Sequence, residues 1–139
     1  MLLLTWLGAV CLAAQTVSLT PLEKEFQDSL NNVTLQGQST SDGTPGVSDD
    51  HYTLEKVVKT GDDRWSFYIR IERNGQAMTI PLPLQVKWAG DTPVITLTDQ
   101  ALPGMGTYTA RVVVYRGHYA GTWSGRSGGG KVFGKIVKP

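Results

Sequence analysis

Residues 125–132 (GRSGGGKV) come closest to a catalytic or ligand-binding motif, because they nearly match the phosphate-binding loop GxxxxGK[ST]. In that motif a hydroxyl residue after the lysine holds magnesium, and a helix follows whose N-terminus faces the phosphates. Here Val132 takes the place of the hydroxyl residue, and the residues after it alternate as in a strand. We therefore interpret the segment as a glycine-rich hairpin connection before a last strand.

Two histidines, His51 and His118, are the only side chains suited to act as bases near neutral pH. His51 follows Asp49 and Asp50, which favours a solvated loop edge over a metal site, and His118 follows the tight turn residue Gly117. The sequence contains no recognisable Ser-His-Asp arrangement. It therefore predicts a protein that is not an enzyme and uses neither a cofactor nor a metal.

Large aromatic residues suggest a binding function instead. We expect four of them to point inward and to form the apolar wall of a site for a small apolar molecule, with residues 38–50 as a lid; they are Trp65, Trp88, Tyr108 and Trp123. Small residues on the same faces, such as Gly121 and Gly134, either seat the rings or leave a pocket, and we favour seating.

The formal net charge of +1 conceals an uneven distribution. Residues 1–99 contain 7 Lys and Arg and 12 Asp and Glu, whereas residues 100–139 contain 6 Lys and Arg and no acid. A basic edge attracts anionic polymers or membranes, so an envelope polymer or a protein is the alternative partner. We expect pairing with the acidic first strands to neutralise most of this edge, and a net charge this small argues against nucleic-acid binding.

The first residues, 1–14 (MLLLTWLGAVCLAA), have the apolar run and small-residue end of a secretory signal peptide. A membrane-spanning helix needs about 20 apolar residues, so the run is too short to cross a bilayer. The sequence thus predicts export to the periplasm, the envelope or the medium. Cys11 is either a passive signal-peptide residue, which we favour, or a lipidated cysteine; its removal would leave a chain without disulfides.

The remaining chain is predicted to be a single domain, in which residues 15–50 precede a β-barrel body at 51–139. Thr20, Pro21 and Glu23 form a capping box that starts a helix over 21–31, with Leu22, Phe26 and Leu30 as its apolar stripe. Apolar residues then recur with period two. We predict strands near 33–37, 52–60, 64–73, 78–88, 93–98, 107–115, 118–124 and 131–137.

No helical pattern interrupts these strands, which favours an all-β fold: an eight-stranded antiparallel up-and-down barrel, with a β-sandwich as the alternative. Asn74-Gly75 is the favoured pair for a two-residue hairpin turn. Pro81 and Pro83 each lack a ladder donor, so the fourth strand should be bulged or unpaired near its middle.

Four segments, at 88–99 (WAGDTPVITLTD), 103–115 (PGMGTYTARVVVY), 119–123 (YAGTW) and 129–136 (GGKVFGKI), resemble a family of small uncharacterised exported bacterial proteins. The resemblance covers residues 26–138 and implies export but no activity. In size, strand count and the Gly-x-Trp at Gly121 and Trp123, the chain also resembles lipocalin- and avidin-type barrels, at the level of architecture only.

Overall fold

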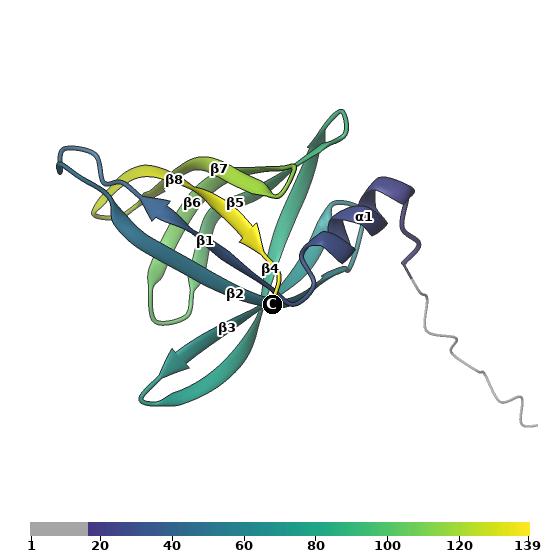
Figure 1. Cartoon of the computed structure of the whole chain (residues 1–139), viewed down its shortest axis with the longest axis horizontal. Coiled ribbons are helices and arrows are strands. Elements are labelled where there is room, and N and C mark those ends of the chain that lie inside the picture. Colours follow the sequence, from purple (N-terminus) through teal and green to yellow (C-terminus); the bar gives the residue numbers. More distant parts are fainter. Residues whose placement is uncertain (1–16) are drawn as a thin grey trace, which may run out of the picture.

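The computed structural model describes residues 17–139, which form one short helix and eight strands closed into an antiparallel barrel (Figure 1). The elements are α1 (Pro21–Ser29), β1 (Val33–Ser39), β2 (Ser48–Lys59), β3 (Arg64–Arg73), β4 (Gln76–Ala89), β5 (Thr92–Leu102), β6 (Gly106–Tyr115), β7 (His118–Gly125) and β8 (Gly128–Val137). Each strand pairs with the next, and β8 pairs with β1, which confirms the up-and-down barrel and excludes the sandwich. The predicted signal peptide at 1–14, with Cys11, lies outside the described residues.

Helix α1 begins with the predicted capping box. The Thr20 hydroxyl accepts a hydrogen bond from the Glu23 amide at 3.2 Å, and the Glu23 carboxylate accepts one from the Thr20 amide at 3.0 Å. The helix ends two residues earlier than predicted, at Ser29. Its buried side differs as well, because Leu22 is 43% exposed whereas Glu23, Phe26 and Leu30 are buried.

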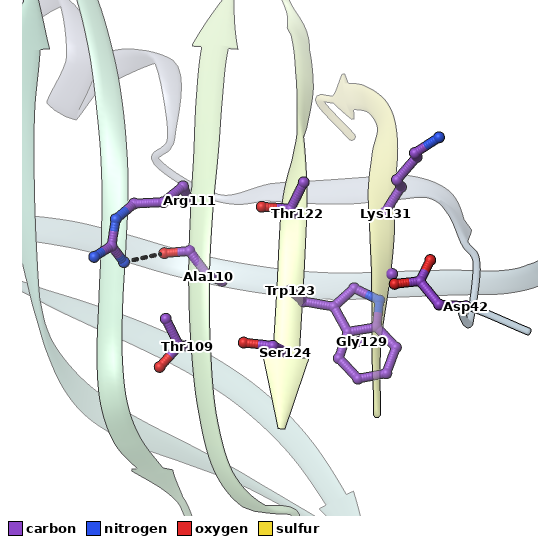
Figure 2. Close-up of a pocket in the computed structure, with 10 residues that line it drawn as sticks. Asp42, Thr109, Ala110, Arg111, Thr122, Trp123, Ser124, Gly129 and Lys131 are labelled. Atoms are coloured by element: carbon purple, nitrogen blue, oxygen red, sulfur yellow. Dashed lines mark hydrogen bonds between the residues drawn. The ribbon is translucent and has the colours of Figure 1, made fainter. Parts of the chain in front are cut away.

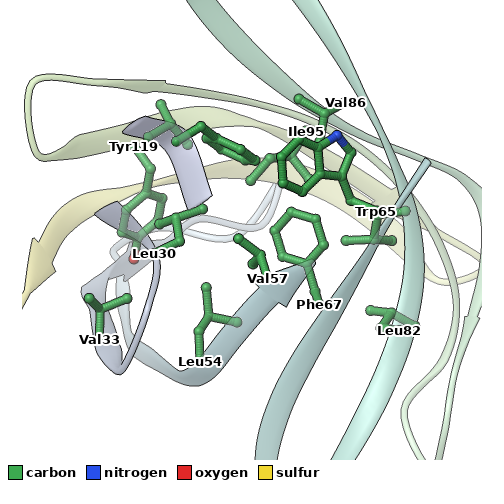
Figure 3. Packing of buried hydrophobic residues seen from close by; sticks show 13 residues of the cluster. Leu30, Val33, Leu54, Val57, Trp65, Phe67, Leu82, Val86, Ile95 and Tyr119 are labelled. Carbon is green, nitrogen blue, oxygen red and sulfur yellow. The ribbon is translucent and has the colours of Figure 1, made fainter. Parts of the chain in front are cut away.

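The best-packed part of the core lies where α1 meets the barrel, and we call this the helix end. The Phe26 ring makes edge-on contacts with Trp65, Trp88 and Phe67, at centroid distances of 5.1, 5.9 and 6.4 Å. Around these rings, Leu30 and Val57 are fully buried (Figure 3). Helix α1 therefore fills one end of the barrel through a single aromatic side chain inserted among three others.

A glycine pair seats an aromatic ring inside the barrel, as predicted for Gly134. Tyr119 on β7 pairs with Gly134 on β8, which in turn pairs with Gly37 on β1. A Cβ atom built on Gly134 would lie 2.7 Å from the Tyr119 hydroxyl oxygen, and one on Gly37 would lie 2.5 Å from it. Any larger residue at either position would meet the phenol and a backbone carbonyl oxygen, so these glycines let the Tyr119 side chain lie over the inner face of β8 and β1.

Several turns and loop boundaries differ slightly from the prediction. Asn74 and Gly75 form the expected two-residue turn, with φ of 53° and 74°. The predicted 38–50 loop is shorter, since β1 continues to Ser39 and β2 starts at Ser48. The predicted 125–130 connection is likewise a two-residue turn at 126–127, because the glycines around it extend β7 and β8. Strand pairing thus recruits residues whose local preferences favour loops.

The two prolines of β4 lie where this strand has no partner on one side. β4 keeps an unbroken register with β3 from Gln76 to Gln85, so the expected bulge is wrong there. Its pairing with β5 begins only at Gln85, so Pro81 and Pro83 occupy a stretch without a β5 neighbour, as the alternative prediction stated. The β3–β4 hairpin reaches away from the rest of the barrel in Figure 1.

Candidate functional site

The structure brings the four predicted wall residues together only in pairs. Trp65 is 1% exposed and, with Trp88, packs on Phe26 at the helix end. Tyr108 and Trp123 lie towards the opposite end of the barrel, which we call the open end, with ring centroids 6.1 Å apart. Tyr108 and Trp123 are both half-buried, whereas in the first pair Trp65 is sealed and only Trp88 is half-buried.

The predicted lid is attached to the barrel wall at its beginning. Thr40, just after β1, accepts a hydrogen bond from the Trp123 indole at 3.1 Å and donates its amide to the Lys131 carbonyl at 2.9 Å. The Asp42 amide donates to the Gly129 carbonyl at 2.7 Å. These bonds hold the start of the loop along β8 and fix the orientation of the Trp123 ring.

Polar side chains also face the barrel interior. The Tyr52 hydroxyl donates to the Asp50 carboxylate at 2.7 Å, and the nearby Tyr119 hydroxyl is buried without a partner among residues 17–139. Burial, aided by the Asp50 charge, raises the pKa of both tyrosines above the ordinary value. Both therefore stay protonated as hydroxyl donors at physiological pH. Sequence reasoning missed this group, although period-two alternation extended back from Leu54 places Tyr52 and Asp50 on the inner face.

A second set of polar side chains, two ion pairs, lies beside α1. The Lys59 ammonium lies 2.6 Å from the buried Glu23 carboxylate, and Lys87 pairs with Asp63. Burial by itself would raise the pKa of Glu23, but hydrogen bonds from Lys59 and Thr20 hold it below its ordinary value. An open pocket of about 420 Å³ lies here, next to Trp88. Because both lysines are already paired, the pocket offers no free cation to an anionic ligand.

The outward side of β6, β7 and β8 carries three cross-strand rows, which together we call the basic face. Strand register sets the rows: Arg111–Thr122–Lys131, then Val113–Ala120–Phe133, then Tyr115–His118–Lys135. All nine side chains are exposed, and none of them is acidic. Three of the six cations that follow residue 99, Arg111, Lys131 and Lys135, thus lie on one surface formed by three neighbouring strands.

The expectation that acidic strands neutralise this edge is wrong. Within residues 17–139 the ion pairs are Lys24–Asp28, Lys59–Glu23 and Lys87–Asp63, and none includes a residue after 99. The strand beside β8 is β1, which contains no charged residue. Strand order therefore separates the cations of β8 from the acids of β2.

One cation of the basic face has a structural role. The Arg111 guanidinium donates to the carbonyls of Leu97 and Ala110 at 2.7 and 2.8 Å, and to the Thr98 hydroxyl at 3.0 Å. These contacts lie at the irregularity in β5 between Leu97 and Gln100. Arg111 thus donates hydrogen bonds to carbonyl oxygens at the distorted part of the β5–β6 ladder. In the Arg111–Thr122–Lys131 row, Lys131 is therefore the cation that is less engaged within the protein.

A pocket of about 330 Å³ lies along the same wall, at the open-end side of the basic face (Figure 2). Thr109, Thr122 and Ser124 contribute hydroxyl groups, and Lys131 lies at one side near Asp42. Figure 2 shows Arg111 turned away from Lys131. The pocket therefore presents hydroxyl groups, the Lys131 ammonium and the Asp42 carboxylate, and of the four predicted aromatic residues only Trp123 lines it.

The other sequence motifs adopt structural roles. Residues 125–132 form the hairpin between β7 and β8, with Gly125 paired to Gly128, so the segment lacks the helix that a phosphate loop needs. His51 and His118 are exposed on different strands, and His118 Nδ1 lies 3.0 Å from the Arg116 carbonyl oxygen. No cluster of three potential metal ligands occurs within residues 17–139.

In the part of the chain that the structure describes, no helix has the length and apolar character needed to span a membrane. Comparison with known proteins gives no assignment: no family model, no curated protein and no solved structure matches this chain.

Proposed function

We propose that the protein is an exported interaction protein of the cell envelope, without enzymatic activity, that binds an anionic polymer or protein through its basic face. One observation carries the proposal: Arg111, Lys131 and Lys135 are exposed on one face of β6–β8 whose three rows hold no acidic side chain, and none of them is in an ion pair within residues 17–139. Such a surface concentrates anionic partners and accelerates their association, and added salt weakens it.

Two features of the sequence support the placement in the envelope. Residues 1–14 have the character of a signal peptide, and the four segments that resemble small exported bacterial proteins include most of β6, β7 and β8. Residues 17–139 contain no cysteine, so the barrel needs no disulfide in an oxidising compartment.

Elution from a heparin column in a salt gradient tests the proposal with a soluble polyanion. The variant Lys131→Gln/Lys135→Gln removes two charges from the basic face, and Lys56→Gln/Arg70→Gln removes two exposed charges from β2 and β3. Both variants have the same net charge. We expect the wild type and the second variant to elute together, and the first variant at clearly lower salt.

Equal elution of the two variants would show that net charge, rather than this face, governs binding. A wild-type protein that is not retained at low ionic strength would contradict the proposal altogether.

A second candidate function is binding of a small apolar molecule at the open end. The half-buried Tyr108 and Trp123 rings, the latter held by Thr40, support it. The neutral probe N-phenyl-1-naphthylamine tests it, because its fluorescence rises in apolar sites. We expect Tyr108→Ala to abolish the rise and Trp88→Phe, at the helix end, to preserve it. If neither the wild type nor Trp88→Phe enhances the probe's fluorescence, this candidate fails.

A further inference from the structure

We propose that the basic face docks on the anionic surface of a lipid bilayer. The inference rests on the proposed function for the exposed basic face, and goes beyond it by naming a bilayer surface, in place of a polymer or protein, as the partner. It follows from the middle row of that face, which is apolar although its side chains are exposed to solvent.

The apolar row crosses three strands. Val113 on β6 pairs with Ala120 on β7, which pairs with Phe133 on β8, and all three side chains point outward. Val113 is 41% exposed and Phe133 is 39% exposed. Tyr115, in the next row, is 48% exposed and adds an amphipathic ring of the kind that lies at membrane interfaces.

Cations stand on both sides of this row. Lys131, Phe133 and Lys135 are successive outward residues of β8, so about 7 Å separates each lysine from the phenylalanine between them. Arg116, in the turn after β6, lies over the Tyr115 ring at 5.3 Å and adds a further positive charge at this edge. Along β8 the basic face therefore presents a cation, an apolar side chain and a second cation, all on one surface.

This alternation fits a bilayer surface better than a soluble polyanion. A charged polymer interacts favourably with the lysines only. An anionic bilayer offers negative headgroups to the lysines and, a few ångströms deeper, hydrocarbon to the apolar row. Lysine side chains are long enough to keep their ammonium groups at headgroup level while an apolar neighbour enters the interface. None of the nine side chains in the three rows is acidic, which limits the repulsion that would oppose close approach, although Asp42 lies near Lys131 beside the first row.

Sedimentation with large unilamellar vesicles tests the inference. The vesicles contain either phosphatidylcholine alone or an equal mixture of phosphatidylglycerol and phosphatidylcholine, and the variants are Phe133→Ser, Phe133→Leu and the control Met78→Ser. Met78 is a matched control because it is 48% exposed on the β3–β4 hairpin, away from the basic face.

We expect binding to the mixed vesicles only, about fivefold weaker for Phe133→Ser and unchanged for Phe133→Leu and Met78→Ser. Removing Lys131 or Lys135 should weaken vesicle binding about fivefold each, because a cation near an anionic surface contributes roughly that factor. On heparin, Phe133→Ser should elute with the wild type, since the polymer gains nothing from the ring.

Equal vesicle binding by the wild type and Phe133→Ser would overturn the inference. So would a wild type that is retained on heparin yet fails to bind mixed vesicles, a result that leaves the proposed function intact. Failure on both heparin and mixed vesicles would overturn the two together.

Discussion

Replacing Phe26 by alanine is the sharpest test of the view that α1 fills one end of the barrel. The ring is 4% exposed and touches three other rings, at 5.1, 5.9 and 6.4 Å. Burial of a phenylalanine contributes about 3 kcal/mol, and each aromatic pair adds about 0.5 kcal/mol or more. The expected loss is about 4.5 kcal/mol, which agrees with the range of roughly 3–5 kcal/mol for Phe→Ala in well-packed cores.

Urea denaturation followed by tryptophan fluorescence measures this loss directly, because Trp65 and Trp88 both contact the ring. With a slope of about 2 kcal/mol per molar, the midpoint should fall by about 2 M. Leu22→Ala is the control, since Leu22 lies on the same helix but is 43% exposed, and it should shift the midpoint by less than about 0.5 M. A Phe26→Ala midpoint within 0.5 M of the wild type would refute the account of α1 as a packed plug.

Three further predictions concern groups that hold the barrel together. The pKa of Glu23 is lowered in the folded protein, so its pairing with Lys59 stabilises the fold fully above the unfolded pKa of about 4.3. This contribution disappears as the pH falls through the folded pKa. In thermal melts, Glu23→Gln should therefore reduce the dependence of stability on pH between about 5 and 3. Gly134→Ala should lower the free energy of unfolding, measured in urea, by about 2 kcal/mol or more, because its methyl group would meet the Tyr119 hydroxyl and the Gln36 carbonyl. Wild-type stability in this variant would show that Tyr119 does not pack closely on Gly134. Arg111→Lys should lower the free energy of unfolding by about 1 kcal/mol and speed amide hydrogen exchange in β5, because a single ammonium cannot reproduce the three hydrogen bonds of the guanidinium. Unchanged exchange would contradict the view that Arg111 holds the irregular part of β5.

Most of the barrel could be predicted from the sequence because period-two alternation and turn chemistry agree with each other. Asn74-Gly75 illustrates the agreement: two positive-φ residues separate two alternating strands, and the structure has the same two-residue turn. The predictions failed where pairing with the neighbouring strand in the chain extends a strand into residues that prefer loops. Asp50 and Gly128 favour loops locally, yet β1 and β7 recruit them into strands.

The candidate surfaces were less predictable for a similar reason. Alternation indicates that Trp65 and Trp123 both point inward, but only the placement of α1 decides that one is sealed and the other half-exposed. The charge division was visible in the sequence, whereas its consequence depended on β1, a strand without charged residues, being the neighbour of β8.

The seam between β1 and β8 has a consequence for the order of folding. Every other strand pair joins neighbours in the chain, whereas this one brings Thr34 to Val137. Contacts so distant along the chain cost the most loop entropy, so the hairpins should form first and the seam last. The glycines at its centre, Gly37 and Gly134, contribute no side chain to an early nucleus. Until Tyr119 settles across them, the chain is an open curved sheet with two free edges, and this state is the one most exposed to aggregation.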